Sequence, residues 1–366
     1  MTGDSGLDLT LIVPGNPDQR TGGYLYDARV VHELRRRGWS IRVIGLDGRF
    51  PETDDRAREH LQSALSALPD NANVLIDGLA LGGAPEAAEA NAHRLRISAL
   101  VHHPLADETG LSERLRRQFV RSEARALAAC RRIIVTSAFC ARRLRELDLS
   151  ASEPRIAEPG VDPAPLAEAP LRWLGGEAVD GAALLCVASL TPRKGQDVLI
   201  DALAALKDRR WQLELVGSTQ RDPAFAARVE SLIDSRGLTQ RVRILGELEQ
   251  DALNVAYARA SVVIVPSHYE GYGMVVTEAL ARGLPLIATD GGALAETVPP
   301  ECSLQVTAGQ VDALSRALAR WLDDQPLRSR LFEQALKGRE QLPSWEQTGD
   351  RLAAALMAGS SAELAR

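Results

Sequence analysis

Short apolar, β-branched segments alternate with longer amphipathic segments along almost the whole chain. The short segments are continuously apolar, which favours strands buried on both faces over half-exposed hairpin strands. In the first half they lie at residues 9–14, 40–46, 73–79, 98–103, 132–137 and 155–158. In the second half they lie at 183–190, 212–217, 242–245, 262–266, 284–289 and 303–306. This alternation predicts parallel sheets whose strands are joined by helices.

The segments between these strands carry the signals of helix ends. Apolar residues recur at helical spacing over 25–34, and the three arginines and the glycine that follow are typical of a helix C-terminus. A second clear helix is expected over 197–207. Beyond Pro326 the chain has a helical pattern, and Pro343 separates a last helical segment at 344–358.

A length of 366 residues favours two domains. Proline and glycine concentrate between the two halves, in a composition that suits neither a helix nor a central strand. We expect a first domain over 1–160, a linker over 161–181, a second domain over 182–342 and a last helix within 343–366. The predicted fold class is α/β, with two doubly wound domains and a cleft at the carboxyl ends of both sheets, where such folds bind ligands.

Composition excludes several classes of protein. The formal net charge is −6, from 43 Lys and Arg against 49 Asp and Glu, which argues against a nucleic-acid partner. The four cysteines form no CxxC pair, so we expect buried, reduced thiols rather than disulfides or a zinc ribbon. The sequence shows neither a secretory leader nor an uncharged apolar run of about 20 residues, which predicts a cytoplasmic protein that contacts membranes at most peripherally.

Several common catalytic motifs are missing from the sequence. It contains no Walker A motif, no GxGxxG after the first strand, no GxSxG and no HExxH. It also contains no Asp-x-Asp triplet, the kind of carboxylate pair that could hold a metal ion on a sugar nucleotide. We therefore expect no metal ion, and negative charge on a ligand must be met by side chains and backbone.

Three segments have the residues to do this. The polar loop after the first strand ends in Gly22-Gly23 at the start of a helix, where backbone N–H groups can approach a phosphate, although such a pair can also be a simple turn. In the second half, Arg193 and Lys194 lie between a strand and a helix. Cations at a helix N-terminus are disfavoured by the helix dipole, so they favour a bound diphosphate over a solvated loop.

The segment 265–285 is the most informative. Glu270 follows a buried strand, and Glu278 lies about one turn into the next helix. Gly271 and Gly273 free the backbone to form a phosphate-sized concavity at that helix N-terminus. A carboxylate can accept two hydrogen bonds from a vicinal diol, so the glutamates could hold sugars on either side of a diphosphate. The alternative is that Glu270 caps the helix and Glu278 belongs to a surface ion pair.

These motifs resemble a known family. The Glu-x7-Glu spacing of 270 and 278 looks like the signature of the retaining glycosyltransferases of family four, a part of glycosyltransferase group 1. The Pro-Arg-Lys-Gly turn, the early Gly-Gly loop and the run 290–292 fit the same pattern. The resemblance covers nearly the whole chain and is strongest over 183–298. It implies the GT-B fold, a second domain that binds the nucleotide sugar, and a last helix that crosses back onto the first domain.

The resemblance also implies roles for single residues. Glu278 would hold the ribose, Glu270 the transferred sugar and Lys194 the diphosphate, while His102 would contact the sugar near the reacting carbon. For the neighbouring His103 we expect a structural role. The catalytic residues implied are His102, Lys194 and Glu270. The donor-binding residues implied are Gly22, Gly23, Arg193, Lys194, Gly217, Gly271, Gly273, Met274, Val275 and Glu278.

One position departs from the family pattern. The family commonly has Gly-Arg where this chain has Ala188-Ser189, so one of two cations expected on the diphosphate is missing. We expect Arg193 to replace it, because it lies in the same loop and a guanidinium can bind a phosphate through two points.

The function implied is metal-independent, retaining transfer of a hexose from a nucleotide diphosphate sugar, such as a UDP or GDP sugar, to an acceptor hydroxyl. The donor is a co-substrate, and no separate cofactor is expected. The acceptor is a saccharide, a lipid or a small metabolite. Arginines along 114–125 would either rest on anionic lipid or, as we prefer, form a solvated face paired with Glu113 and Glu123. The alternatives are a phosphorylase or a sugar-nucleotide epimerase of the same fold, or a non-catalytic partner subunit that binds the nucleotide sugar, which Ser189 motivates.

Overall fold

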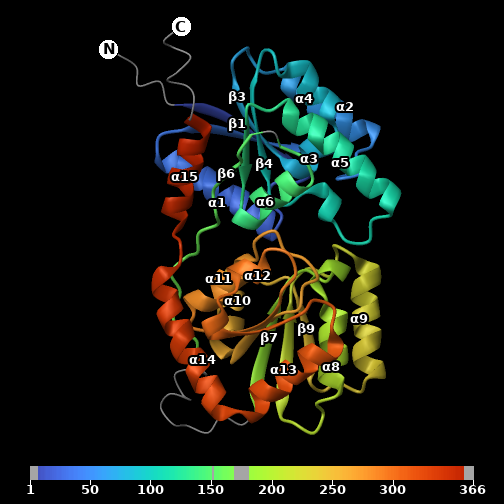
Figure 1. The fold of residues 1–366 in the computed structure, drawn as a ribbon, viewed down its shortest axis with the longest axis vertical. Coiled ribbons are helices and arrows are strands. Elements are labelled where there is room, and N and C mark those ends of the chain that lie inside the picture. Colours follow the sequence, from blue (N-terminus) through green and yellow to red (C-terminus); the bar gives the residue numbers. More distant parts are fainter. Residues whose placement is uncertain (1–6, 151, 169–180, 358–366) are drawn as a thin grey trace. The chain divides into compact units, whose positions relative to one another are not determined.

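The computed structural model describes residues 7–150, 152–168 and 181–357. The chain divides into two compact units, residues 1–160 with 343–366 and residues 161–342. Each unit is a six-stranded, all-parallel sheet with helices around it (Figure 1). The predicted α/β class is therefore confirmed.

The sheet of unit 1 has the strand order β2-β1-β3-β4-β5-β6. Its strands are β1 (Asp8–Pro14), β2 (Ser40–Leu46), β3 (Asn73–Asp77), β4 (Arg96–Val101), β5 (Arg132–Val135) and β6 (Arg155–Ile156). Its helices are α1 (Gly22–Arg36), α2 (Asp55–Ser66), α3 (Gly78–Gly82), α4 (Pro85–Asn91), α5 (Glu113–Ala128), α6 (Ala138–Glu146) and α15 (Trp345–Met357), with a 3-10 turn at Leu105–Asp107. The order of the strands reverses between β1 and β3, which is where doubly wound sheets bind their ligands.

The core of unit 1 packs the central strands against helices. Ile12 and Ile76 from the sheet and Leu61 and Leu144 from α2 and α6 are completely buried in one apolar cluster. Full burial of such a side chain contributes about 1.5–3 kcal/mol to the free energy of folding. The expectation that every strand is buried on both faces is wrong for β2 and β6, because these are edge strands with exposed positions.

The last helix, α15, follows unit 2 in the sequence but packs on α1 of unit 1. Arg37 at the end of α1 binds Asp350 with a nitrogen–oxygen distance of 2.7 Å. The Thr348 hydroxyl donates to the carbonyl of Glu158 at 2.7 Å. The helix therefore lies on the first unit, where the resemblance places it, while residues 358–366 of that predicted segment lie outside the described residues.

The sheet of unit 2 has the order β12-β11-β10-β7-β8-β9. Its strands are β7 (Ala182–Val187), β8 (Trp211–Val216), β9 (Val242–Gly246), β10 (Val262–Val265), β11 (Leu286–Thr289) and β12 (Ser303–Val306). Its helices are α8 (Gln196–Ala204), α9 (Pro223–Ser235), α10 (Gln250–Arg259), α11 (Met274–Ala281), α12 (Leu294–Thr297), α13 (Val311–Asp323) and α14 (Gln325–Gly338), with 3-10 turns at Pro192–Lys194, Pro300–Cys302 and Arg339–Gln341. Here the order reverses between β7 and β10, the position at which such sheets leave a crevice for a ligand.

The expected linker is only partly described, because residues 169–180 lie outside the described residues. Its first part belongs to unit 2: the Ala167 amide donates to the carbonyl of Arg282, and Arg339 donates to the carbonyl of Ala164.

Two strands of unit 1 end earlier than predicted. Gly78 already begins α3, and His102 and His103 lie in the loop that follows β4.

All four cysteines are free thiols, and all except the half-buried Cys130 are buried. Within the described part of the chain, no helix has the length and apolar character needed to cross a membrane.

Candidate active site

The loop between β10 and α11 forms the centre of the candidate site in unit 2. Gly273 begins α11 in the left-handed region, with a φ of 91°. This backbone conformation favours glycine, and a β-carbon at Gly273 would also lie 2.8 Å from the end of the Leu294 side chain, which would have to shift. The residue before the helix is therefore Gly273, and the alternative that Glu270 caps this helix is wrong.

Glu270 is instead fixed by the loop after β11. Its amide donates to the carbonyl of Gly291 at 3.2 Å, and its carbonyl accepts from the Ala293 amide at 2.8 Å. A β-carbon at Gly291 would lie 2.4 Å from the carbonyl oxygen of His268, and one at Gly292 would lie 2.4 Å from that of Glu270. The glycines of the run 290–292 thus allow two backbone segments to approach closely and hold Glu270 in place.

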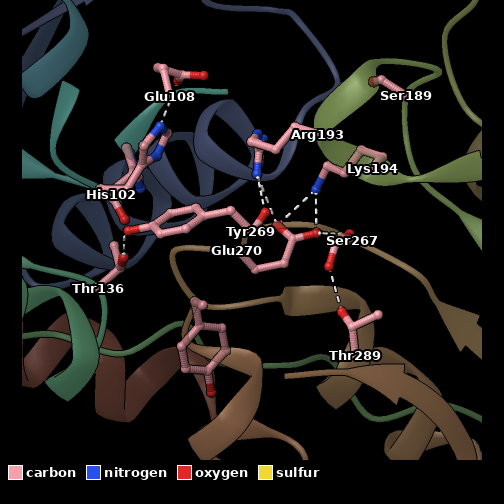
Figure 2. A network of polar contacts seen from close by, with 12 residues as sticks. His102, Glu108, Thr136, Ser189, Arg193, Lys194, Ser267, Tyr269, Glu270 and Thr289 are labelled. Atoms are coloured by element: carbon pink, nitrogen blue, oxygen red, sulfur yellow. Dashed lines mark hydrogen bonds and ion pairs between the residues drawn. The ribbon is translucent and has the colours of Figure 1, made fainter. Parts of the chain in front are cut away.

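The Glu270 side chain binds two cations and a hydroxyl. Lys194 Nζ lies 2.6 Å and 2.8 Å from its two oxygens, and Arg193 lies 3.3 Å from Oε2. The Ser267 hydroxyl donates to Oε1 at 2.7 Å, and the Ser267 carbonyl accepts from Thr289. Figure 2 shows Arg193 and Lys194 pointing toward this carboxylate from one loop, with Ser267 and Thr289 behind it. We call Arg193, Lys194 and Glu270 the cation pair cluster.

Charge dominates the cation pair cluster. Burial raises the pKa of Glu270, which is only 6% exposed, but the charges of Lys194 and Arg193 outweigh it and lower the pKa to about 2. Burial also lowers the pKa of Lys194, and the charge of Glu270 opposes that change. With one carboxylate against two cations, the cluster has a positive charge in excess, which suits an anionic ligand.

The loop that carries the two cations is fastened to the loop of Glu270. The His268 amide donates to the carbonyl of Arg193 at 2.8 Å. Gly195 has a φ of 66°, and a β-carbon there would lie 2.2 Å from the Pro266 carbonyl oxygen. Gln196 donates to the carbonyl of Ser189 at 3.1 Å. The Arg193 guanidinium reaches the same carboxylate as Lys194, and its predicted replacement of an arginine at 189 stays a prediction.

Glu278 lies half-buried on α11 and accepts a hydrogen bond of 2.7 Å from the Tyr257 hydroxyl. The Arg282 guanidinium lies over the Tyr257 ring, 4.2 Å from its centroid. The alternative of a surface ion pair is wrong, since Glu278 has no cationic partner among residues 7–150, 152–168 and 181–357. Packing explains the glycine at 217, because a β-carbon there would lie 2.2 Å from the Ala188 carbonyl oxygen.

In unit 1, Gly22 and Gly23 begin α1 and His102 follows β4. A β-carbon at Gly23 would lie 3.6 Å from the His102 ring, so this turn and the ring are in contact. His102 Nε2 lies 3.4 Å from Asp27 Oδ1 and 3.5 Å from Asp77 Oδ2. We call Asp27, Asp77 and His102 the acid pair cluster, because two carboxylates flank one imidazole.

Burial and charge act against each other in the acid pair cluster. Burial lowers the pKa of His102, but the carboxylates of Asp27 and Asp77 outweigh it, and the net shift is upward. Burial raises the pKa of Asp77 to about 6, and the charge of His102 opposes the rise. The three ligand atoms lie within 4.8 Å of one another, so this is the group that could hold a metal ion among the described residues.

The predicted site residues are divided between the two units. His102, Gly22 and Gly23 belong to unit 1 and the rest to unit 2.

Two neighbouring expectations are also resolved. His103 lies 2.6 Å from Glu108, a local contact that fits a structural role. The expected pairing of the arginines of α5 with Glu123 is wrong, because Glu123 is buried and accepts from the Leu105 amide at 3.0 Å. Arg125 instead binds Glu86 and Glu89.

Sequence reasoning missed several polar residues at both clusters. They are Asp27, Asp77, Tyr257, Ser267 and Thr289. Asp77 and Thr289 each end a strand, so their position at the carboxyl edge of a sheet was a usable signal. Asp27 and Tyr257 lie within helices and reach their partners only through the tertiary fold, so the sequence carried no local signal for them.

Comparison with known proteins finds similarity to one family in the second half of the chain. Residues 172–338 match the model of "Glycosyl transferases group 1". A GDP-mannose-dependent monoacylated alpha-(1-6)-phosphatidylinositol monomannoside mannosyltransferase of Corynebacterium glutamicum is 37% identical over 182 residues, 46% of this chain and 45% of the relative. A D-inositol 3-phosphate glycosyltransferase of Geodermatophilus obscurus is 31% identical over 252 residues, 65% of this chain and 55% of the relative. The chain thus spans about half the length of these relatives.

Solved structures resemble the whole chain. Sucrose-phosphate synthase of Thermosynechococcus elongatus has a TM-score of 0.80 at 23% identity, covering 97% of this chain and 99% of that one. Anabaena HepE, solved in complex with UDP and glucose, has a TM-score of 0.72 at 19% identity, covering 96% and 99%. These similarities confirm the predicted GT-B fold. Residues 172–338 are thus similar to the glycosyl transferases of group 1, the family that the motifs of this chain resemble.

Proposed function

We propose that this protein transfers a hexose from a nucleotide diphosphate sugar to an acceptor hydroxyl, with retention of configuration and without a metal ion on the diphosphate. The observation that carries the proposal is the cation pair cluster, which places a net positive charge beside the N-terminus of α11. A helix N-terminus also attracts anions through its dipole and its free N–H groups. The names of the relatives, which include mannosyltransferases, support the same class of reaction.

In this proposal each part of the donor is bound by different polar groups of unit 2. Lys194 and Arg193 bind the diphosphate, and the backbone of Gly273, Met274 and Val275 caps it. Glu278 accepts from the ribose hydroxyls, with the Tyr257 hydroxyl fixing one carboxylate oxygen. The diphosphate takes over part of the charge that Glu270 now balances, which frees the Glu270 oxygens for the hydroxyls of the transferred sugar.

The chemical step follows from the same charges. Departure of the nucleoside diphosphate leaves an oxocarbenium-like sugar and a developing dianion. Lys194 and Arg193 stabilise the dianion as it forms, the role that oriented positive groups take in such steps. In this arrangement the Glu270 oxygens accept from hydroxyls of the transferred sugar, so a covalent glycosyl intermediate on Glu270 is disfavoured. We therefore propose attack by the acceptor hydroxyl on the face from which the diphosphate leaves, with its proton passing to the departing diphosphate and with His102 contacting the sugar.

The acceptor is proposed only as a class. Relatives named for inositol phosphate and phosphatidylinositol mannoside acceptors suggest testing polyols, saccharides and lipids that carry phosphate. The same names and the solved complexes make GDP-mannose and UDP-glucose the first donors to test. We propose a cytoplasmic site of action, since nucleotide sugars are the co-substrates.

The test is a thermal-shift screen of the full chain against UDP, GDP, ADP and their sugar conjugates without added metal. A ligand that binds only the folded state must raise Tm, so one nucleotide should do so in the wild type and much less in Glu278→Gln. The sugar conjugate of the nucleotide that raises Tm is then incubated with acceptors. NMR determines the anomeric configuration of the product. Retention supports the proposal. Inversion, phosphate-dependent cleavage of a disaccharide, epimerisation of the donor, or binding without transfer would each replace it with another function.

A further inference from the structure

A small cavity lies in unit 1 between one face of the sheet and the end of α15. Four polar residues of the sheet and two apolar residues of the helix line it: Asn73, Arg96, Ser98, Arg132, Leu356 and Met357. Its volume is about 40 Å³, which is room for about three water molecules or for one carboxylate or phosphate group. The function proposed above does not use this cavity.

The register of the strands explains why the polar side chains meet. Asn73 lies opposite Arg96, and Ser98 lies opposite Arg132. Residues opposite each other, and residues two apart on one strand, point to the same face of a sheet, so all four side chains share one face. Arg96 and Arg132 are the first residues of β4 and β5. The cavity therefore lies at the amino edge of the sheet, whereas His102 lies beyond its carboxyl edge.

Arg96 brings a positive charge to the cavity that no residue of the described chain balances. Its buried Nε has no hydrogen-bond partner, and its guanidinium forms no ion pair within the described residues. By contrast, the nearby Arg94 donates to two backbone carbonyls and to Asp70. Arg132, which has other contacts as well, adds a second guanidinium. No aspartate or glutamate of the described chain lines the cavity, so its charge suits an anion.

Apolar side chains lie beside the two guanidiniums. Leu9, Trp39 and Leu356 line the cavity and are only 3–8% exposed. Leu7 and Met357 also line it, but they are 41% and 49% exposed. They are two of the five large apolar side chains that are exposed in the described chain. An oxyanion that fills the cavity leaves these two side chains to cover an apolar part of the same ligand, so the lining fits an amphiphilic anion better than a bare inorganic one.

We propose that this cavity binds a small organic anion, a carboxylate or a phosphate monoester that carries a short apolar chain. The Arg96 guanidinium donates to the oxyanion, since its fork of N–H groups matches both head groups. The apolar chain lies on Leu7 and Met357. The ligand thereby joins β4 to the end of α15. The site is separate from the diphosphate site of unit 2, so the transfer proposed above stands or fails independently of it.

The experiment titrates the full chain by calorimetry with hexanoate, hexyl phosphate, acetate and hexan-1-ol. We expect one site for hexanoate, hexyl phosphate or both, and the tighter of the two identifies the head group. Acetate, which lacks the chain, and hexan-1-ol, which lacks the charge, should each bind at least about 10-fold more weakly. The tighter ligand should also raise Tm, because it binds only the folded state.

Arg96→Met should weaken binding of the tighter ligand at least about 10-fold, the scale of one hydrogen bond to a charged group. Arg96→Lys should retain part of the affinity, because it keeps the charge and loses the fork. The matched control is Arg155→Met, which should bind like the wild type. Arg155 is also the first residue of a strand of this sheet, β6, but it is exposed and lies outside the lining of the cavity.

Two further variants locate the bound anion. Trp39 lines the cavity, so the ligand should change tryptophan fluorescence in the wild type and change it much less in Trp39→Phe. Lys194→Met removes a cation of the diphosphate site and should leave the affinity for the ligand unchanged. A loss of affinity in Lys194→Met would assign the anion to the diphosphate site and overturn the proposal.

Three other results would also overturn it. The first is a wild type that binds neither hexanoate nor hexyl phosphate, and the second is equal affinity for these anions and for hexan-1-ol or acetate. Both are measured on the wild type and do not depend on whether the variants fold. The third is full affinity in Arg96→Met that melts cooperatively. None of these results bears on nucleotide binding, which is measured separately.

Discussion

Both units place three charged or titratable side chains at the carboxyl edge of a parallel sheet, but the balance of charge is opposite. In unit 2, Lys194 and Arg193 surround the single carboxylate of Glu270 at 2.6–3.3 Å. In unit 1, the carboxylates of Asp27 and Asp77 flank the single imidazole of His102 at 3.4–3.5 Å. The first cluster is closed by ion pairs and has spare positive charge. The second has a gap and spare negative charge.

The difference teaches that the same place in the fold can carry charge of opposite sign. Parallel strands end at one edge of a sheet, so the loops that follow them share that edge, whatever their residues are. The side chains then decide the charge there, which is positive in excess in unit 2 and negative in excess in unit 1. The following changes test this comparison, in order of decreasing expected effect.

Lys194→Met should have the largest effect, since it removes the closest cation of the cation pair cluster. We expect kcat/KM for the donor to fall at least about 100-fold, the usual loss when one group that stabilises developing negative charge is removed. Lys207→Met is the control, because Lys207 is exposed. Steady-state kinetics with a fixed acceptor measure both. Equal losses in the two variants contradict the role of Lys194.

Arg193→Ser should cost about 10-fold or more in donor binding, the scale of one hydrogen bond to a charged group. The double variant Arg193→Ser with Ser189→Arg restores the arginine of the family pattern and should recover binding. Calorimetric titration with UDP and GDP measures the affinities. Two results would show that Arg193 does not replace the missing cation. One is an unchanged nucleotide affinity in Arg193→Ser. The other is a reduced affinity in Arg193→Ser that the double variant does not recover.

Glu123 sharpens the comparison, because it is a buried carboxylate that accepts from a backbone amide and, within the described part of the chain, from no cation. Burial raises the pKa of Glu123 to about 8, whereas the cations around Glu270 lower the pKa of Glu270 to about 2. A carboxyl whose pKa is raised on folding stabilises the fold when protonated, and this contribution is lost as pH rises from about 4.5 through 8. We expect Tm to fall over this range in the wild type.

The variant Glu123→Gln should flatten the dependence of Tm on pH, since a neutral amide can still accept from the Leu105 amide. Melting curves from pH 5 to pH 9 measure this. The matched control is Glu89→Gln, an exposed carboxylate paired with Arg125. The same slope of Tm against pH in Glu123→Gln and wild type would mean that Glu123 is already ionised in the fold.

Tyr257→Phe should have the smallest effect. It removes the hydroxyl that donates to Glu278, worth about 1 kcal/mol or a few-fold in nucleotide affinity. The change should affect KM for the donor more than kcat, because the ribose contact is made before and during the transfer. An equal nucleotide affinity in Tyr257→Phe and wild type would remove Tyr257 from the ribose subsite.

The parts of the site that the sequence predicted are residues whose positions follow from local signals. Arg193, Lys194 and Glu270 lie in loops after strands whose apolar runs were clear, so their meeting at one edge could be inferred. The edge strands β2 and β6 were misjudged, because exposure depends on strand order, which apolar runs alone do not fix. Asp27 was missed and Glu123 was predicted to be solvated for a related reason. A charged residue in a helix is taken for a surface residue until its packing partner is known.

The central claim is that the cation pair cluster of unit 2 binds a diphosphate through its excess positive charge. The most direct measurement compares UDP and GDP with uridine and guanosine by calorimetry, on the wild type and on Lys194→Met without added metal. The account predicts that one diphosphate binds the wild type at least about 100-fold more tightly than its nucleoside, and that Lys194→Met loses most of this difference. Equal affinity for diphosphate and nucleoside in the wild type, or an unchanged difference in Lys194→Met, would contradict it.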